Sequence, residues 1–319
     1  MKILTPFNDI KYLEQFLDAG ADEFYIGFFS DEWKQRFGRY SDINRLTLFK
    51  ETANRYTLED MAEITHQVHA ADRPLYVTLN APGYHREELA QLAEYIRTLG
   101  SFGVDGIITG IPEMTDLIHR NGMKAIASTM CGIQNADLAG WYRDVGMDRI
   151  IFPRELATHE MYSIIQAVPE PEYEAFLMRN GCRYQDANCL GLHGGTHGAL
   201  CYSLRFGDTV CHGRPGSGDF SERLEQAHDT FCHSFHEFAC GQCAIYRLNR
   251  IGVGTFKIVG RLDDPDEILQ DVALTKKNIE IAARCESEED YLHAMTLTGD
   301  FEQYCRYGLS CYYPEVRWQ

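Results

Sequence analysis

Cysteine residues gather in one stretch of this chain, residues 173–243, which holds seven of the eleven cysteines. Cys182 and Cys189 are separated by six residues and follow the apolar run 175–178, which is typical of a buried strand. Cys240 and Cys243 form a Cys-x-x-Cys further along, and Cys201 lies between the two pairs. Thiols held at the end of a strand and joined by a Cys-x-x-Cys are typical of soft-metal ligands.

A metal centre is therefore predicted, and its chemical identity stays open at this point. Four thiolates satisfy either a 4Fe–4S cluster or a tetrahedral zinc ion. For zinc, nitrogen ligands are available from His193, His197, His212, His233 and His236. The alternative is that the cysteines are buried packing residues, which is the interpretation we favour for the scattered remainder. These are Cys131, Cys285, Cys305 and Cys311.

Composition describes an ordinary globular enzyme. The chain has 319 residues, 45% of them apolar and 24% charged, and no window approaches 18 consecutive apolar residues. The first residues lack the apolar core of a signal peptide, so we expect a cytoplasmic protein without a membrane segment. In a reducing compartment clustered thiols are more often metal ligands than disulfides. The net charge of −17 argues against non-specific nucleic-acid binding.

Short apolar runs alternate with amphipathic segments along the chain, which predicts parallel strands joined by helices. Five helix-like segments end in a glycine, as at Gly20 and Gly252, directly before the next apolar run. This pattern predicts an α/β fold, a (β/α)8 TIM-barrel-like domain; a doubly wound open sheet is the runner-up. The eight expected strands are residues 2–5, 23–28, 74–80, 106–109, 124–128, 149–152, 174–178 and 255–259.

Two stretches interrupt the alternation. Residues 29–56 are aromatic and charged and are expected to form a loop or small subdomain over one mouth of the barrel. Residues 181–252 form a cysteine-rich insert between strands seven and eight, and a long loop in a compact domain is usually functional. We therefore expect a barrel domain over residues 1–285 and a C-terminal extension over residues 286–319.

Polar residues follow the expected strands at the end where parallel barrels place their active sites. Arg154 and Glu155 follow strand six, Lys257 lies in strand eight, and Arg261 follows it. Such groups can orient an anionic substrate or move protons, although an internal ion-pair network would use the same residues. Asn80 ends strand three and is a candidate for hydrogen bonding to a ligand.

The order and spacing of several motifs resemble the peptidase U-32 (collagenase-like protease) family over roughly residues 1–285. The motifs are GADEFYIGF, VTLN, SxxxGIQN, RIIFPREL, EYEAFLMRNGC and GVGTFKIVGR. The last is similar to the family's Lys-Ile-Glu-Gly-Arg signature, with Val259 in place of the glutamate. The family has no established peptidase residues, and several members are instead oxygen-independent hydroxylation proteins that carry a 4Fe–4S cluster.

The resemblance implies a set of cluster ligands in this chain. Cys182 and Cys189 match the first two cluster cysteines, and Cys243 matches the fourth. The third position stays open, because neither Cys201 nor Cys211 has the usual spacing; we favour Cys201, and Cys240 is a possible substitute.

Three functions follow as hypotheses. The leading one is a redox or hydroxylation enzyme acting on a small aromatic or RNA-borne ring, with Arg154, Glu155, Lys257 and Arg261 holding an anionic co-substrate. The second is a peptidase, with zinc or without metal. The third is a non-catalytic partner subunit, since some relatives are thought to work in pairs.

Overall fold

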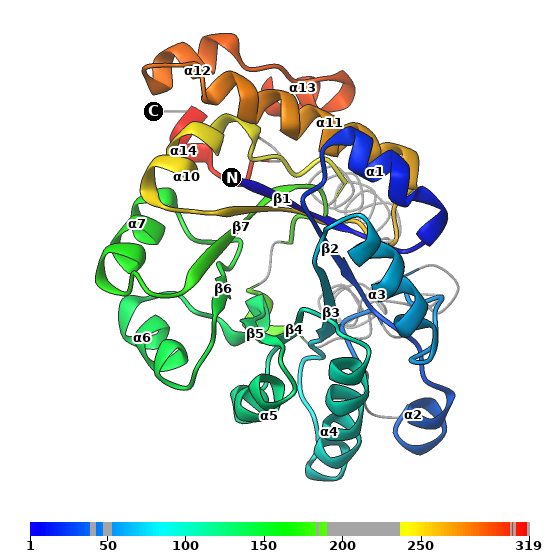
Figure 1. Ribbon diagram of the computed structural model, residues 1–319. Helices are drawn as coiled ribbons and strands as arrows, with labels where there is room; N and C mark the ends of the chain where they lie inside the picture. Colours follow the sequence, from blue (N-terminus) through cyan, green and yellow to red (C-terminus); the bar gives the residue numbers. More distant parts are fainter. Residues whose placement is uncertain are drawn as a thin grey trace, which may run out of the picture.

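Eight parallel strands close into a barrel in chain order, and β8 pairs back onto β1. The computed structural model describes residues 1–38, 43–46, 53–182, 185–189, 237–306, 308 and 311–317. Helices surround the strands (Figure 1), and neighbouring helices of the ring, such as α6 and α7, pack on one another. The predicted (β/α)8 barrel is therefore confirmed.

Strand positions agree with the sequence prediction to within two residues at every end. β2 and β3 are buried at every position, as expected for strands covered on both faces. The strands are β1 (Lys2–Pro6), β2 (Glu23–Ile26), β3 (Leu75–Leu79), β4 (Gly106–Thr109), β5 (Lys124–Ala127), β6 (Arg149–Ile151), β7 (Glu172–Met178) and β8 (Thr255–Ile258).

The helices lie between consecutive strands and after the last one. α10 occupies part of the predicted insert, residues 181–252, and leads into β8. The helices are α1 (Leu13–Ala19), α2 (Asp31–Arg36), α3 (Asp60–Ala70), α4 (Arg86–Ser101), α5 (Thr115–Arg120), α6 (Ala136–Asp144), α7 (Thr158–Ala167), α10 (Ile245–Ile251), α11 (Pro265–Ala282), α12 (Glu288–Ala294), α13 (Gly299–Arg306) and α14 (Pro314–Arg317). Short 3-10 turns are η1 (Ile10–Tyr12), η2 (Pro112–Met114), η3 (Thr129–Cys131), η4 (Asp186–Asn188) and η5 (Gln242–Ala244).

Glycine ends the helices as predicted. Gly20 follows α1 and Gly252 follows α10, each with a φ of 105°, a left-handed conformation that other residues rarely adopt. The other three predicted glycines also have positive φ. The next strand begins two or three residues after each of these glycines.

A charged layer fills the amino-terminal end of the barrel. Arg149, fully buried, lies 2.7 Å from Glu23, 2.7 Å from Glu172 and 3.3 Å from Glu174. Burying a charge costs less free energy when the charge is paired, and here Arg149 is shared by three carboxylates. Each also binds one lysine, in the pairs Glu23–Lys2 (2.9 Å), Glu172–Lys124 (2.6 Å) and Glu174–Lys257 (2.8 Å).

The last helices pack against the barrel helices. α12 contacts α10 and α11, and α14 contacts η5 (Figure 1). Tyr313 is 1% exposed and its hydroxyl donates to the carbonyl of Phe176 in β7, at 2.7 Å. The division of the chain at residue 285 stays a prediction. Within the described part of the chain, no helix combines the length and apolar character that a membrane crossing requires.

Candidate active site at the carboxyl ends of the strands

The exit of β7 is held in a strained conformation that leads directly to Cys182. Arg179 and Asn180 both have positive φ, 60° and 50°, which costs free energy in residues with a side chain. Arg179 forms ion pairs with Asp271 and, at 3.0 Å, with Glu267. These contacts with α11 compensate for the strain and hold the backbone that leads to Cys182.

Asp186 is the anionic centre of this mouth. Its buried carboxylate lies 2.7 Å from Arg45 Nη1 and also pairs with Arg154. Burial alone would raise the pKa of Asp186, but Arg154 and Arg45 outweigh it and hold the pKa below the ordinary value. The guanidinium of Arg154 also stacks 3.8 Å from the ring centre of Phe176. Asp186 lies between the two cysteines in sequence and fixes two cations beside them.

Cys182 and Cys189 therefore lie in positively charged surroundings. Arg45 Nη2 is 3.6 Å from the sulfur of Cys189, and Cys182 is among the groups that raise the pKa of Arg154. Both cysteines are half-buried and neither is in a disulfide. Guanidinium groups beside sulfur ligands compensate the negative charge of a thiolate-bound centre, so the donor chemistry of this pair fits a soft metal or an iron–sulfur cluster.

Arg261 follows β8 and is a buried cation, 5% exposed. Its two terminal nitrogens donate to the side-chain oxygens of Asn54 and Asn44, each at 3.2 Å. Burial lowers the pKa of Arg261 to about 10, although nearby Tyr25 acts in the opposite direction. Among the described residues no carboxylate pairs with this guanidinium. An unneutralised buried cation at a barrel mouth is suited to bind an anion.

Gly27, at the end of β2, makes room for this arrangement. A Cβ at that position would lie 2.2 Å from Arg261 Nη1 and 2.2 Å from the Asn54 side-chain oxygen. Asn44, Arg45 and Asn54 all come from the stretch 29–56. The prediction that this stretch covers one mouth of the barrel is confirmed for these residues.

Two further polar atoms at this mouth are buried and lack a hydrogen-bond partner among the described residues: Asn80 Oδ1 and Arg154 Nε. The amide nitrogen of Asn80 donates to Ser128 at the end of β5, at 3.2 Å. Buried polar atoms are normally satisfied, so one free acceptor and one free donor here indicate positions for a ligand.

The structure separates Lys257 and Glu155 from this group. Lys257 points into the barrel, where its ammonium lies 2.8 Å from Glu174 and 4.0 Å from the ring centre of Tyr25. Burial lowers the pKa of Lys257 despite the attraction of Glu174. Glu155 is exposed and accepts a hydrogen bond from Gln134 at 2.6 Å. Catalytic roles for both stay predictions.

The proposed metal ligands are only partly within the described residues. Cys201, the alternative Cys211 and the five histidines lie outside them. Cys243 is buried, and the Cys311 thiol together with burial raises the pKa of Cys243. Among the described residues, no set of three or more His, Cys, Asp or Glu side chains is arranged to hold a metal ion. The four-cysteine ligand set thus stays a prediction.

Several residues of this site were not predicted from the sequence: Asn44, Arg45, Asn54 and Asp186. Only Asp186 had a usable signal, since it lies between Cys182 and Cys189. Arg45 and the two asparagines come from a stretch without a regular pattern, and their partners are more than a hundred residues away.

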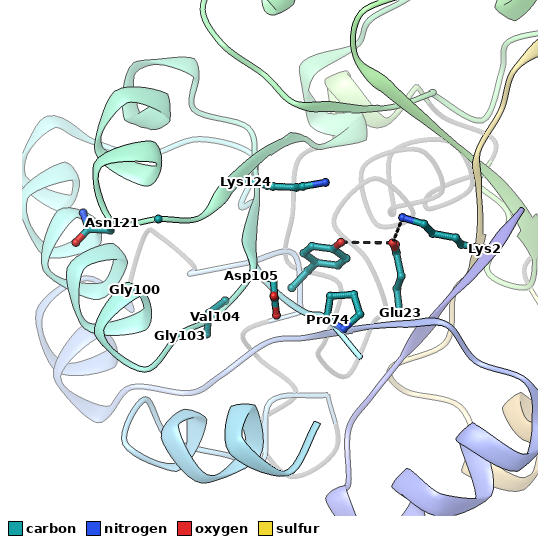
Figure 2. A pocket seen from close by; sticks show the side chains of 11 residues that line it. Lys2, Glu23, Pro74, Gly100, Gly103, Val104, Asp105, Asn121 and Lys124 are labelled. Atoms are coloured by element: carbon teal, nitrogen blue, oxygen red, sulfur yellow. Dashed lines mark hydrogen bonds and ion pairs between the residues drawn. The ribbon is translucent and has the colours of Figure 1, made fainter. Parts of the chain in front are cut away.

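A cavity of about 590 Å³ opens at the opposite, amino-terminal end of the barrel. Figure 2 shows Lys2 and Glu23 pointing toward one another there, with Lys124 on the neighbouring wall. The carboxylate of Glu23 is already bound by Arg149 and Lys2, so it has little capacity left for a ligand. This end of a barrel usually serves stability, and the paired charges fit that role.

The chain is similar in sequence to several known proteins. The chain is 22% identical over 298 residues to tRNA hydroxylation protein P1 of Bacillus subtilis (strain 168), covering 91% of this chain and 65% of that protein. It is 25% identical over 192 residues to tRNA hydroxylation protein P of Helicobacter pylori (strain J99), covering 60% and 42%.

A third relative is the 23S rRNA 5-hydroxycytidine C2501 synthase of Escherichia coli (strain K12), 28% identical over 219 residues, covering 68% of this chain and 27% of that protein. The chain thus spans less than two thirds of the length of each of these relatives. The model of the family described as Peptidase family U32 matches residues 8–318. Because that match covers nearly the whole sequence, the chain belongs to peptidase family U32.

Proposed function

We propose that this chain takes part in the hydroxylation of a base in RNA, with the reaction at the carboxyl-terminal mouth of the barrel. Three relatives that modify tRNA or ribosomal RNA by hydroxylation support this reaction class. The observation that carries the proposal is the position of Cys189 beside the Arg45 guanidinium, which Asp186 anchors together with Arg154. Cys182 interacts electrostatically with that second guanidinium.

A 4Fe–4S cluster on Cys182, Cys189, Cys201 and Cys243 belongs to this proposal. When bound, such a cluster supplies one-electron transfer at a potential set by nearby charge and hydrogen bonds. In that setting Arg45 and Arg154 balance the negative charge of the sulfur ligands. Asp186 keeps both guanidiniums in place, because each arginine is bound to one of its oxygens.

Arg261 has the role of holding an anionic group of the co-substrate or of the RNA. Its guanidinium is fixed by Asn44 and Asn54 and has no described carboxylate to neutralise it. Asn80 Oδ1 and Arg154 Nε offer one acceptor and one donor to a polar ligand. A ligand held by fixed groups loses little freedom on reacting, which lowers the barrier.

The overall charge of −17 affects how RNA is bound. General attraction to the phosphate backbone is weak for such a chain, because long-range electrostatics are repulsive. Recognition then depends on local cations such as Arg45, Arg154 and Arg261, and on an unpaired base entering the mouth. Single-stranded loops are the RNA elements whose bases can be presented in this way.

The test is a comparison of RNA nucleosides from cells with and without the gene for this chain. We expect one hydroxylated nucleoside, detected by mass spectrometry of digested tRNA and ribosomal RNA, to disappear without the gene. Wild-type chain and Cys285→Ser should restore it, whereas Cys182→Ala should not. Identical nucleoside profiles in all strains would contradict the proposal.

The peptidase function implied by the family name is the second candidate. Incubation of the purified chain with a peptide mixture, with and without a chelator, separates the two. Cleavage by iron-free protein that is lost in Arg261→Met would favour a peptidase.

A further inference from the structure

One aromatic side chain of the C-terminal segment reaches the candidate active site. Tyr312 is 6% exposed, and its backbone nitrogen donates to the carbonyl of Cys240 at 2.9 Å. Cys240 also forms β-bridges with Cys311 on one side and with Met178, the last residue of β7, on the other. The backbone of the segment is thus held beside the exit of β7, and the Tyr312 side chain starts from a fixed position.

The hydroxyl of Tyr312 supports the strained turn that precedes Cys182. It donates to the carbonyl of Arg179 at 2.7 Å. Arg179 and Asn180 both have positive φ, and such a conformation persists only where surrounding contacts hold it. The ion pairs of Arg179 with α11 hold its side chain. The Tyr312 hydroxyl and the carbonyl of Ala239 hold its backbone, because they bind its carbonyl and its amide respectively.

The ring of Tyr312 supports Arg154 through one intervening side chain. It stacks on Phe176 with ring centres 6.0 Å apart and planes 22° apart. The Arg154 guanidinium lies 3.8 Å from the centre of the same Phe176 ring, and it is also bound by Asp186. In a close-packed interior, a change in one side chain is felt by its neighbours. A smaller side chain at position 312 therefore loosens Phe176 and, through it, the guanidinium.

We propose that Tyr312 is a positioning residue of the candidate active site, and that residues 311–317 support this site. Tyr312 acts through other residues. Its ring acts on Arg154 through Phe176, and its hydroxyl acts on the backbone that leads to Cys182. The effect on the reaction rests on the proposed function, whereas the effect on the turn does not.

The neighbouring tyrosine provides a matched control. The Tyr313 hydroxyl donates to a backbone carbonyl, that of Phe176 in β7, at the same distance of 2.7 Å, and Tyr313 is likewise buried. Replacing either tyrosine by phenylalanine removes one buried hydrogen bond and keeps the ring. The bond of Tyr312 ends on the strained turn, and the bond of Tyr313 ends inside a regular strand. A merely structural role predicts equal effects of the two substitutions, whereas a positioning role predicts unequal ones.

Amide hydrogen exchange of the full chain measures the effect on the turn. Mass spectrometry of peptides that contain residues 179–182 reports how often this backbone opens. We expect these amides to exchange several-fold faster in Tyr312→Phe than in the wild type, and at the wild-type rate in Tyr313→Phe. The proposal is overturned if the turn exchanges no faster in Tyr312→Phe than in Tyr313→Phe.

Restoration of the RNA modification in cells without the gene measures the effect on the reaction. Tyr312→Leu, which lacks both the ring and the hydroxyl, should restore several-fold less of the hydroxylated nucleoside than the wild type at equal chain levels. Tyr313→Phe should restore it fully, and Tyr312→Phe, which also serves where Tyr312→Leu does not accumulate, should restore less than Tyr313→Phe. Full restoration by the Tyr312 variants overturns the proposal. If the wild type itself restores nothing, the proposed function fails, and the exchange measurement still decides whether Tyr312 positions the turn.

Discussion

Two buried arginines of this barrel lie in opposite electrostatic surroundings. Arg149 is paired with three carboxylates at the amino-terminal end, whereas the partners of the Arg261 guanidinium among the described residues are two amides at the carboxyl-terminal mouth. A paired buried charge supports the fold, but an unpaired one costs free energy and is retained for another reason. We infer that Arg261 is retained because it binds an anion.

Replacing each arginine by methionine separates these roles. Arg261→Met should leave the free energy of unfolding unchanged or raise it, because a buried cation is removed, and should abolish binding of anionic ligands. Arg149→Met should lose about 3–5 kcal/mol, because three carboxylates are left without their shared cation. Urea unfolding and calorimetric titration measure both effects. Equal destabilisation by the two substitutions would show that Arg261 is structural.

At the scale of elements, regular features were predictable and irregular ones were not. Strand and helix positions follow from apolar periodicity and from glycines such as Gly20, which are local signals. Arg45 meets Asp186, and Asn54 meets Arg261, through contacts between residues more than a hundred positions apart, and no local pattern encodes such contacts. The location of the site at the carboxyl ends of the strands could be predicted from the sequence, but the ion pairs that form there could not.

The end of β2 gives a sharp test of the mouth. Gly27→Ala puts a methyl group 2.2 Å from both Arg261 and Asn54, so one of the two must move. We expect a loss of about 1–3 kcal/mol of stability and weaker anion binding. Gly83→Ala, which meets nothing within 4 Å, is the control and should change neither. Normal anion binding by Gly27→Ala would show that the Arg261 position is not critical.

The ion pairs at the amino-terminal ends of the strands predict that acid destabilises the fold. Burial opposes ionisation of Glu172, but Lys124 and Arg149 lower its pKa from 4.5 to about 2. Between these two pKa values the unfolded chain binds more protons at Glu172 than the folded chain does. The stabilisation from the Glu172 ion pairs is therefore complete above pH 4.5 and is lost as the pH falls toward about 2.

Thermal melts across this pH range measure the effect. Glu172→Gln should be less stable than the wild type at neutral pH and should lose less stability on acidification. Glu94→Gln, at an exposed carboxylate, should behave like the wild type. An unchanged acid dependence in Glu172→Gln would place the sensitive group elsewhere.

At the scale of the whole molecule, residues 311–317 pack against the barrel at β7 and η5. Tyr313 is buried against Gly241 and bonds to β7, although the sequence suggested only a short extension. Tyr313→Ala should cost about 3–5 kcal/mol, the range for a large buried aromatic side chain. Tyr162→Ala, at a site 47% exposed, should cost within about 0.5 kcal/mol. Similar denaturant midpoints for the two variants would show that the segment is dispensable.

The most direct measurement of the central claim is the iron and sulfide content of the chain purified without oxygen. The account predicts about four iron and four sulfide per chain, lost in Cys189→Ser and kept in Cys285→Ser. Iron-free wild-type protein that still hydroxylates RNA at full rate would contradict it.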